Sequence, residues 1–164
     1  MASTYVPIAT TTLGSAAASY TFTSISSAYT DLRVVISTAT TKGSQSGFGI
    51  QVGNASIDTG SNYSVTRLGG NGSVAYSERT SNQTSVAMAM QPTLSNFFID
   101  FQNYSNTTTY KTFLITDDNA SVYAIRAVGL WRSTSAINQV KIFDTDGYNL
   151  IAGSTLTLYG IKAA

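Results

Sequence analysis

The feature that most constrains the fold of this chain is an alternation of apolar and polar residues with a period of two. Apolar side chains occupy every second position in residues 20–23, 32–37, 48–52, 97–102 and 155–158. Residues two apart lie on the same face of a β-strand, so each segment predicts a strand with one face in a core. No helical segment long enough for a β–α–β crossover is present. The chain is therefore predicted to be all-β.

Two further segments, residues 111–116 and 122–131, carry apolar residues on both faces. This pattern is typical of central strands, or of strands whose outer face meets another subunit. A sandwich buries only one face of each strand in its own core, so we expect the second face to contact another copy of the chain. The side chains expected between chains are Phe113 and Ile115 or Leu114, together with Tyr123 or Val128.

Clusters of turn residues separate these segments, at residues 42–43, 58–60, 69–72, 103–106, 117–119 and 144–147. They divide the chain into about ten short strands. The pattern predicts a single domain, residues 1–164, folded as a two-sheet antiparallel β-sandwich. A jelly-roll-like topology is favoured, with an immunoglobulin-type sandwich as the alternative. Pro7 marks the place where a short N-terminal arm, about residues 1–12, or an edge strand begins.

Charged residues make up only 10% of the chain, against about 25% in an average soluble domain. A surface made polar by hydroxyl and amide groups suits a protein that packs against its own copies or a partner. The net charge is +1 and the basic residues are scattered singly, so we expect no binding to nucleic acid or to a membrane surface. The uncharged N-terminal residues are expected to make contacts between subunits or with a partner; they are Tyr5, Val6, Pro7 and Ile8.

The chain contains no histidine and no cysteine. Their absence excludes the Ser-His-Asp triad, the Cys-His pair and every zinc site with His or Cys ligands. A carboxylate pair of the kind that glycosidases use remains, but most acidic residues lie in predicted turns, where they cap the backbone. We therefore expect no enzymatic activity and no cofactor. The acidic residues are Asp31, Asp58, Glu78, Asp100, Asp117, Asp118, Asp144 and Asp146.

Residues 144–149 place two aspartates beside a glycine, an arrangement from which calcium loops are built. The third acidic position and the distant glutamate of an EF-hand are missing, so a glycine-containing hairpin loop is favoured over a metal site. Residues 69–72 are rich in glycine but no Lys-Ser/Thr pair follows, so they predict no phosphate loop.

Ten tyrosines and one tryptophan raise the alternative of carbohydrate binding, because aromatic rings stack on sugar rings. Tyr20 and Tyr159 belong to alternating strands and are expected to pack. Trp131 ends an apolar segment and is interpreted as a core or interface residue. The tyrosines in or beside predicted loops are the candidates for exposed glycan contacts; they are Tyr63, Tyr76, Tyr104 and Tyr110.

The N-terminal segment has no basic region of the kind that begins a signal peptide. No apolar run approaches the roughly 18 residues that a membrane-spanning helix needs. We therefore expect the chain to stay in the compartment where it is made, and not to be an integral membrane protein.

Four segments of the chain carry recognisable motifs. Residues 19–35 lead from a strand through a Tyr-Thr-Asp-Leu turn into an apolar strand, and residues 58–68 contain Gly-Ser-Asn-Tyr-Ser. Residues 129–132 read Gly-Leu-Trp-Arg, and residues 153–162 end on a Leu-Tyr-Gly strand. In these segments the chain resembles a family of small virion proteins of tailed bacteriophages. The resemblance implies a jelly-roll-like β-sandwich built into the particle, as a head decoration (cement) protein or as part of the tail tip or fibre. It brings no catalytic residues.

Three functions follow from these observations. The first is a cement protein that binds the outside of the shell, stabilises it, and assembles as a homo-oligomer, a trimer before a dimer. The second is a tail-fibre or receptor-binding domain that recognises host surface glycans, and the third, least favoured, is a polysaccharide-degrading enzyme. The expected partners are the major capsid protein or tail proteins of the same phage. The chain is expected to be made in the host cytoplasm and to reside in the virion.

Overall fold

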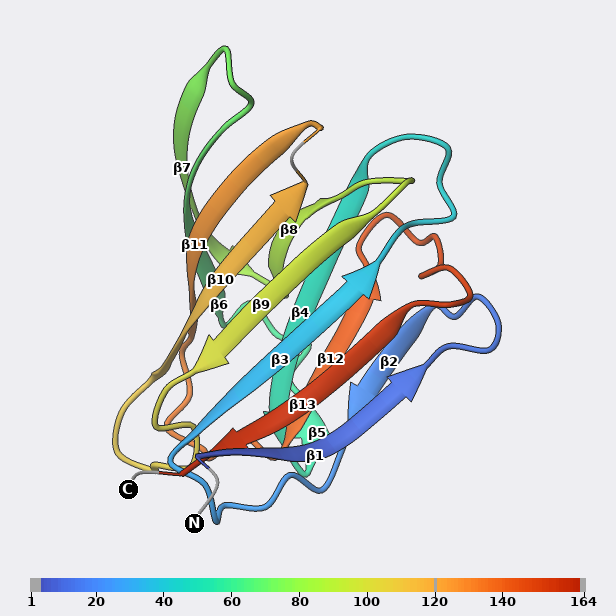
Figure 1. Ribbon diagram of the computed structural model, residues 1–164. Helices are drawn as coiled ribbons and strands as arrows, with labels where there is room; N and C mark the ends of the chain where they lie inside the picture. The colour runs from blue at the N-terminus through green and yellow to red at the C-terminus, as the bar shows by residue number, and fades with distance from the viewer. Residues whose placement is uncertain (1–3, 120, 163–164) are drawn as a thin grey trace.

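The computed structural model describes residues 4–119 and 121–162, which form thirteen strands arranged as a jelly-roll-like β-sandwich (Figure 1). The predicted all-β fold of two antiparallel sheets is confirmed. The strands are β1 (Tyr5–Thr12), β2 (Ser19–Phe22), β3 (Asp31–Thr38), β4 (Ser46–Asn54), β5 (Ser56–Ile57), β6 (Tyr63–Gly70), β7 (Ala75–Gln83), β8 (Val86–Met90), β9 (Ser95–Phe101), β10 (Lys111–Asn119), β11 (Tyr123–Trp131), β12 (Gln139–Asp144) and β13 (Thr155–Ile161).

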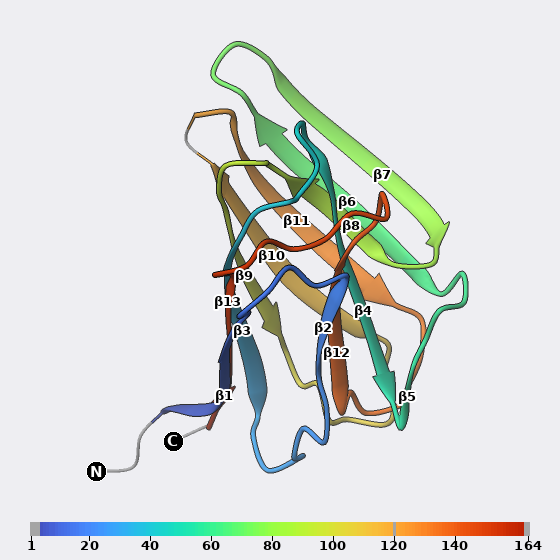
Figure 2. The same cartoon turned by 90° about the vertical axis from the view of Figure 1, so that its right-hand side faces the viewer.

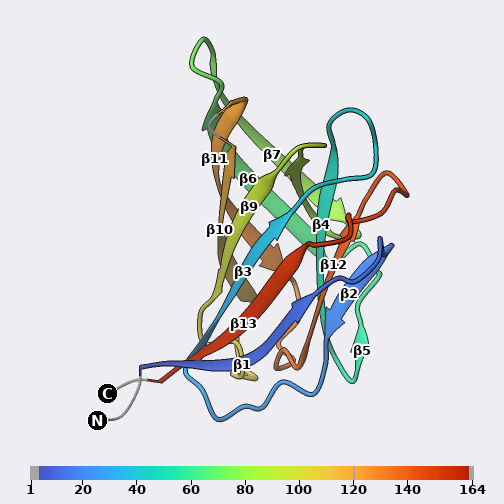
Figure 3. The ribbon, with the colours of Figure 1, turned by 45° about the vertical axis from the view of Figure 1, so that its right-hand side comes forward.

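The two sheets differ in width. The larger has eight strands in the order β1-β13-β3-β9-β10-β11-β6-β7, and the smaller has five, β2-β12-β4-β5 with β8 also paired to β4. Figure 2 shows the two layers side by side, and Figure 3 shows the β6–β7 hairpin at one end of the larger sheet. Eight of the nine residues of β7 are exposed and one is half-buried. The end of the larger sheet therefore extends beyond the cover of the smaller one.

The core lies where the two sheets face each other, and the alternation of the sequence selects its residues. In β3 every second side chain, beginning with Leu32, is buried, and the residues between them are half-buried. Phe48 of β4 stacks on Phe97 of β9, with ring centroids 3.7 Å apart, and so joins the two sheets. Phe101 and Phe113 lie in register on neighbouring strands, with centroids 4.8 Å apart. Removing these rings from water supplies the main drive for the sheets to pack.

The expected contact residues of β10 and β11 divide between the two faces of the larger sheet. Phe113 and Ile115 are fully buried in the chain's own core, so their assignment to a contact between chains was wrong. Leu114 and Val128 face outward and are exposed. Because both faces of β10 are apolar, its sequence does not show which side chains point into the core. The pairing of Phe113 and Ile115 with buried residues of β9 shows that these two do.

The predicted N-terminal arm is an edge strand over most of its length, which is the alternative that the sequence had left open. Residues 5–12 form β1, which pairs antiparallel with β13. The register shifts between Pro7 and Ala9, and Ile8 packs against the core. A proline on an edge strand leaves no ladder hydrogen bond unmade inside the sheet. Residues 1–3 of the predicted arm lie outside the described residues.

Two turn and strand predictions need correction. Residues 117–119, predicted as a turn, are the last residues of β10, and the turn to β11 follows Asn119. The alternation also identified no strand between residues 53 and 96, where the structure has β5 to β8. A strand shows the period of two only when a core covers one of its faces, and β7 has no covered face.

We predict that Gly129→Ala destabilises the fold by about 1–3 kcal/mol, the usual cost of overpacking. Gly129 lies opposite Phe113 in the β10–β11 pair, and a Cβ at Gly129 would stand 2.5 Å from the ring of Phe113. Urea denaturation measures the change. Gly43→Ala is the matched control, because a Cβ at Gly43 meets nothing within 4 Å. An equal loss of stability in both variants would show that packing at position 129 is not the cause.

Candidate functional site

Two of the four tyrosines expected to contact glycans are buried. Tyr63 and Tyr104 have no exposed area, so their assignment as exposed contacts was wrong. The Tyr63 hydroxyl donates to the Asp58 carbonyl oxygen at 2.8 Å and accepts from the Val52 N–H at 3.0 Å, and the Tyr104 hydroxyl donates to the Ser26 carbonyl oxygen. These backbone partners allow a phenol to lie inside the protein. Burial raises the pKa of Tyr63 above its ordinary range.

Tyr76, by contrast, is exposed on the inner face of the β6–β7 hairpin, the end of the larger sheet that the smaller sheet does not cover. It pairs with Gly69 of β6, which in turn pairs with Ile125 of β11, so all three positions belong to one row across the sheet. Gly69 carries no side chain, and a Cβ there would stand 3.0 Å from the Tyr76 ring. The missing side chain lets the ring lie across β6 toward Ile125.

A groove of about 380 Å³ lies between this hairpin and the edge of the smaller sheet. We call it the overhang groove. Its apolar surface comes from β8 and β11, and its polar groups come from β6, β7 and the loops that flank β4 and β12. The lining residues are Gln45, Ser46, Gly47, Arg67, Tyr76, Glu78, Met88, Ala89, Ile125 and Asp146.

The charges of the overhang groove are paired within the chain. Arg67 Nη1 lies 2.7 Å from Glu78 Oε2, and Arg67 Nε donates to the Ala87 carbonyl oxygen at 2.9 Å. Lys42 Nζ lies 2.7 Å from Asp146 Oδ2, and the hydrogen bond from Lys42 holds the pKa of Asp146 below its ordinary value. The groove thus presents fixed donors and acceptors with little unbalanced charge.

Asp117 lies behind the groove, fully buried on the inner face of β10 between Phe97 and Ile125. Neither carboxylate oxygen has a hydrogen-bond partner among the described residues. Burial raises the pKa of Asp117 to about 8, with a smaller contribution from the charge of Asp118. A buried carboxyl without a partner is stable only in its neutral form, so Asp117 carries a proton at neutral pH.

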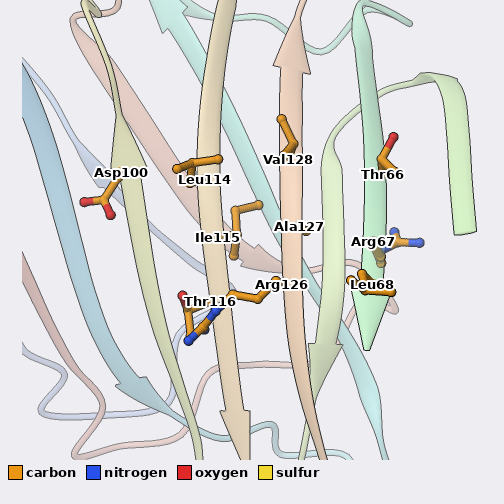
Figure 4. A pocket seen from close by; sticks show the side chains of 10 residues that line it. All are labelled: Thr66, Arg67, Leu68, Asp100, Leu114, Ile115, Thr116, Arg126, Ala127 and Val128. Carbon is orange, nitrogen blue, oxygen red and sulfur yellow. The ribbon is translucent and has the colours of Figure 1, made fainter. Parts of the chain in front are cut away.

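A second candidate surface lies on the opposite, outer face of the same strands (Figure 4). Leu68, Leu114 and Val128 project from β6, β10 and β11 into a shallow hollow of about 420 Å³. Leu68 is 64% exposed, the other two are almost half exposed, and Phe98 of β9 is exposed beside them. We call these four residues the outer patch. Three aliphatic side chains and one aromatic ring on an open sheet face indicate a contact surface.

Two ion pairs border the outer patch, and the exposed Arg79 lies at its β7 side, opposite Thr66. Arg33 Nε and Nη2 donate to the two carboxylate oxygens of Asp100 at 2.6 and 2.8 Å, and Asp100 lies on the outer face of β9 opposite Leu114. Arg126 Nη1 lies 3.7 Å from Asp118 Oδ1. No uncompensated charge within the described residues therefore borders the patch on these two sides.

The other predicted contact residues lie in three places. Tyr5 and Pro7 are exposed at the β1 edge, and the Tyr5 ring packs edge-on against Tyr159, with centroids 6.3 Å apart. Val6 and Ile8 are half-buried. Tyr123 is half-buried and accepts a hydrogen bond from Gln91 Nε2 at 3.0 Å. Leu114 and Val128 are the predicted contact residues that belong to the outer patch, and Tyr110 is exposed in the loop before β10.

Trp131, interpreted from the sequence as a core or interface residue, belongs to the core. Its indole is buried, and Nε1 donates to Asp58 Oδ2 at 2.7 Å. Burial opposes the charged form of Asp58, but the hydrogen bonds from Trp131, Asn62 and Gly60 outweigh it and hold the pKa of Asp58 below its ordinary value. The bond ties β11 to the turn before β6.

The loop at residues 144–147 is a turn fixed by hydrogen bonds to the Asp144 carboxylate, two of them from side chains outside the loop. Asp144 accepts from the Thr40 hydroxyl at 2.7 Å, from the Ser46 hydroxyl at 2.8 Å and from the Asp146 N–H at 2.8 Å. Across residues 4–119 and 121–162, no group of three acidic side chains is close enough together to hold a metal ion. Over the same residues no helix could cross a membrane.

Comparison with known proteins finds similarity only among solved structures. No family model and no curated protein matches the chain. The galectin LEC-6 of Caenorhabditis elegans aligns over 94% of this chain and 96% of its own, with 8% identity and a TM-score of 0.38. The alginate lyase Aly36B, solved with an alginate tetrasaccharide, aligns over 89% of this chain and 81% of its own, with 9% identity and a TM-score of 0.34. Likeness at this level supports no conclusion about activity.

We predict that Asp117→Asn stabilises the protein at pH 7–8 and has little effect at pH 4. The folded chain keeps the Asp117 proton up to about pH 8, whereas the unfolded chain loses it near the ordinary pKa of 3.8. Between these values the folded state binds the extra proton, so rising pH lowers the free energy of unfolding by up to about 1.4 kcal/mol per pH unit. Urea denaturation from pH 4 to 9 measures this slope. Identical slopes in the two proteins would show that Asp117 is ionised in the folded state.

Proposed function

We propose that the chain is a non-enzymatic structural protein of a bacteriophage particle, a capsid decoration (cement) protein that binds the outer shell as a homo-oligomer. The observation that carries the proposal is the outer patch, an apolar surface on the open face of the larger sheet. The resemblance of four segments to small virion proteins supports the same assignment. The occupant of the outer patch is a second copy of this chain.

The charges around the outer patch favour a contact between copies. Two identical surfaces repel each other when they carry unbalanced charge. Arg33 is paired with Asp100 and Arg126 with Asp118, and the cation of Arg79 lies at the β7 edge of the patch. The whole chain has a net charge of only +1. Burying Leu68, Leu114 and Val128 between copies removes apolar area from water, at about 25 cal/mol per Å². In a cyclic trimer the three copies of the patch meet when the patch lies at the three-fold axis.

A cement protein of this form acts by binding the closed shell and not its separated subunits. Binding of one state alone stabilises that state by mass action. An oligomer that touches several neighbouring copies of the major capsid protein holds them together without chemistry. The exposed residues of the β1 edge, Tyr5 and Pro7, are the surface we assign to the capsid contact, because they lie on the outer face away from the patch.

The alternative place in the particle, the tail tip or fibre, uses the same assembly surface but differs in copy number. A decoration protein is expected in numbers comparable to those of the major capsid protein, and a tail protein in few copies. Quantitative mass spectrometry of purified particles separates the two. A ratio to the major capsid protein far below one would contradict the cement assignment and favour the tail.

We predict that Leu114→Lys and Val128→Lys convert the oligomer to a folded monomer. Each change places a charge in the outer patch that a contact between copies would bury unpaired, at a cost of several kcal/mol. Light scattering coupled to size-exclusion chromatography measures the mass. Thr10→Lys, an exposed change on β1 of the same sheet, is the control and should leave the oligomer intact. A wild-type chain that is monomeric at micromolar concentration, or an oligomer unchanged by both substitutions, would refute the contact.

A further inference from the structure

We propose that the overhang groove binds a neutral oligosaccharide, a function separate from assembly through the outer patch. The groove and the patch lie on opposite faces of the same strands. Arg67 lines the groove and Leu68 belongs to the patch, and neighbouring residues of a strand point to opposite faces. A contact between copies at the outer patch therefore leaves the groove open.

The groove holds one aromatic platform. Tyr76 is 39% exposed and its ring lies across Gly69, where no side chain intervenes. Met88 and Ile125 lie beside it but are only 4% and 3% exposed, so the Tyr76 ring supplies most of the apolar contact area. The C–H face of a pyranose ring packs well on such a surface, where an aromatic ring offers a large contact area at a low entropic cost.

Hydrogen-bonding groups surround this platform. Arg67 donates from Nη1 to Glu78 Oε2 and from Nε and Nη2 to the Ala87 carbonyl oxygen, which leaves one N–H on each Nη, together with Glu78 Oε1, for a ligand. Gln45 and Asp146 lie in the same lining. Neighbouring hydroxyls of a sugar donate to one partner and accept from another, which matches an arginine beside a carboxylate. Apolar contact together with a few fixed polar groups is typical of ligand sites.

The pairing of charges selects a neutral ligand. An anionic sugar would have to approach the carboxylates of Glu78 and Asp146, and a cationic group would compete with Arg67 and Lys42 for them. A neutral sugar binds without breaking either pair. The arrangement is also held in place, because Arg67 of β6 donates to the Ala87 carbonyl oxygen of β8 and so fixes the two sides of the groove relative to each other.

The test has two steps on the intact protein. A glycan array with neutral and acidic oligosaccharides is screened first, and the strongest neutral binder is then titrated by isothermal calorimetry, which gives an affinity per chain. Tyr76→Ala and Glu78→Gln should each weaken that affinity at least tenfold. Tyr110→Ala is the matched control, because Tyr110 is also an exposed tyrosine but does not line the groove. Thermal melting confirms that each variant is folded.

The outcomes separate this proposal from the assembly surface. Leu114→Lys should bind the same glycan with unchanged affinity per chain whether or not it alters the oligomer. Three results would overturn the proposal: no neutral glycan retained on the array, retention of acidic glycans alone, or an affinity that Tyr76→Ala and Tyr110→Ala change equally.

Discussion

The unequal width of the two sheets is the constraint on which the rest of the structure depends. Five strands cannot cover eight, so the core forms beneath β3, β9 and β10, where Phe48 and Phe97 join the layers. The far end of the larger sheet is left without a full partner. Its inner face becomes the overhang groove. The outer patch, where Leu114 and Val128 project, lies on the back of strands whose inner face is covered, so the mismatch creates the groove and not the patch.

The same mismatch explains which strands the sequence could predict. β3 and β9 lie under the smaller sheet, so burial imposes a period of two on their residues and the pattern is visible without a structure. β7 has no buried face, and its sequence of polar residues resembles a loop. In β10 and β11 both faces are apolar, so the pattern predicted the strands but not their phase. Only the pairing with β9 shows that Phe113 faces the core and Leu114 faces outward.

The candidate site was predictable only in part, because a tyrosine suits a core as well as a surface. Tyr63 and Tyr104 are buried since distant backbone groups bond their hydroxyls, and sequence proximity to loops does not reveal such partners. Tyr76 was named correctly as exposed, but its platform depends on Gly69 across the strand pair. Asp117 resembled a turn residue, and its burial follows from a hairpin that closes later than the turn signal suggested.

Low charge connects the two proposed functions. The ion pairs Arg33–Asp100 and Arg67–Glu78 are partly exposed and add little stability. The first reduces the unbalanced charge that would oppose contact between copies, and the second leaves a groove that favours neutral ligands. An oligomer joined through the outer patch carries one groove per chain on the faces turned away from the contact. A shallow groove binds a single sugar weakly, and several grooves held at fixed spacing bind a surface that repeats the sugar far more tightly. Assembly then supplies the avidity that a single groove lacks, so a chain confined to the monomer should hold a glycan-coated surface much less well than the oligomer does.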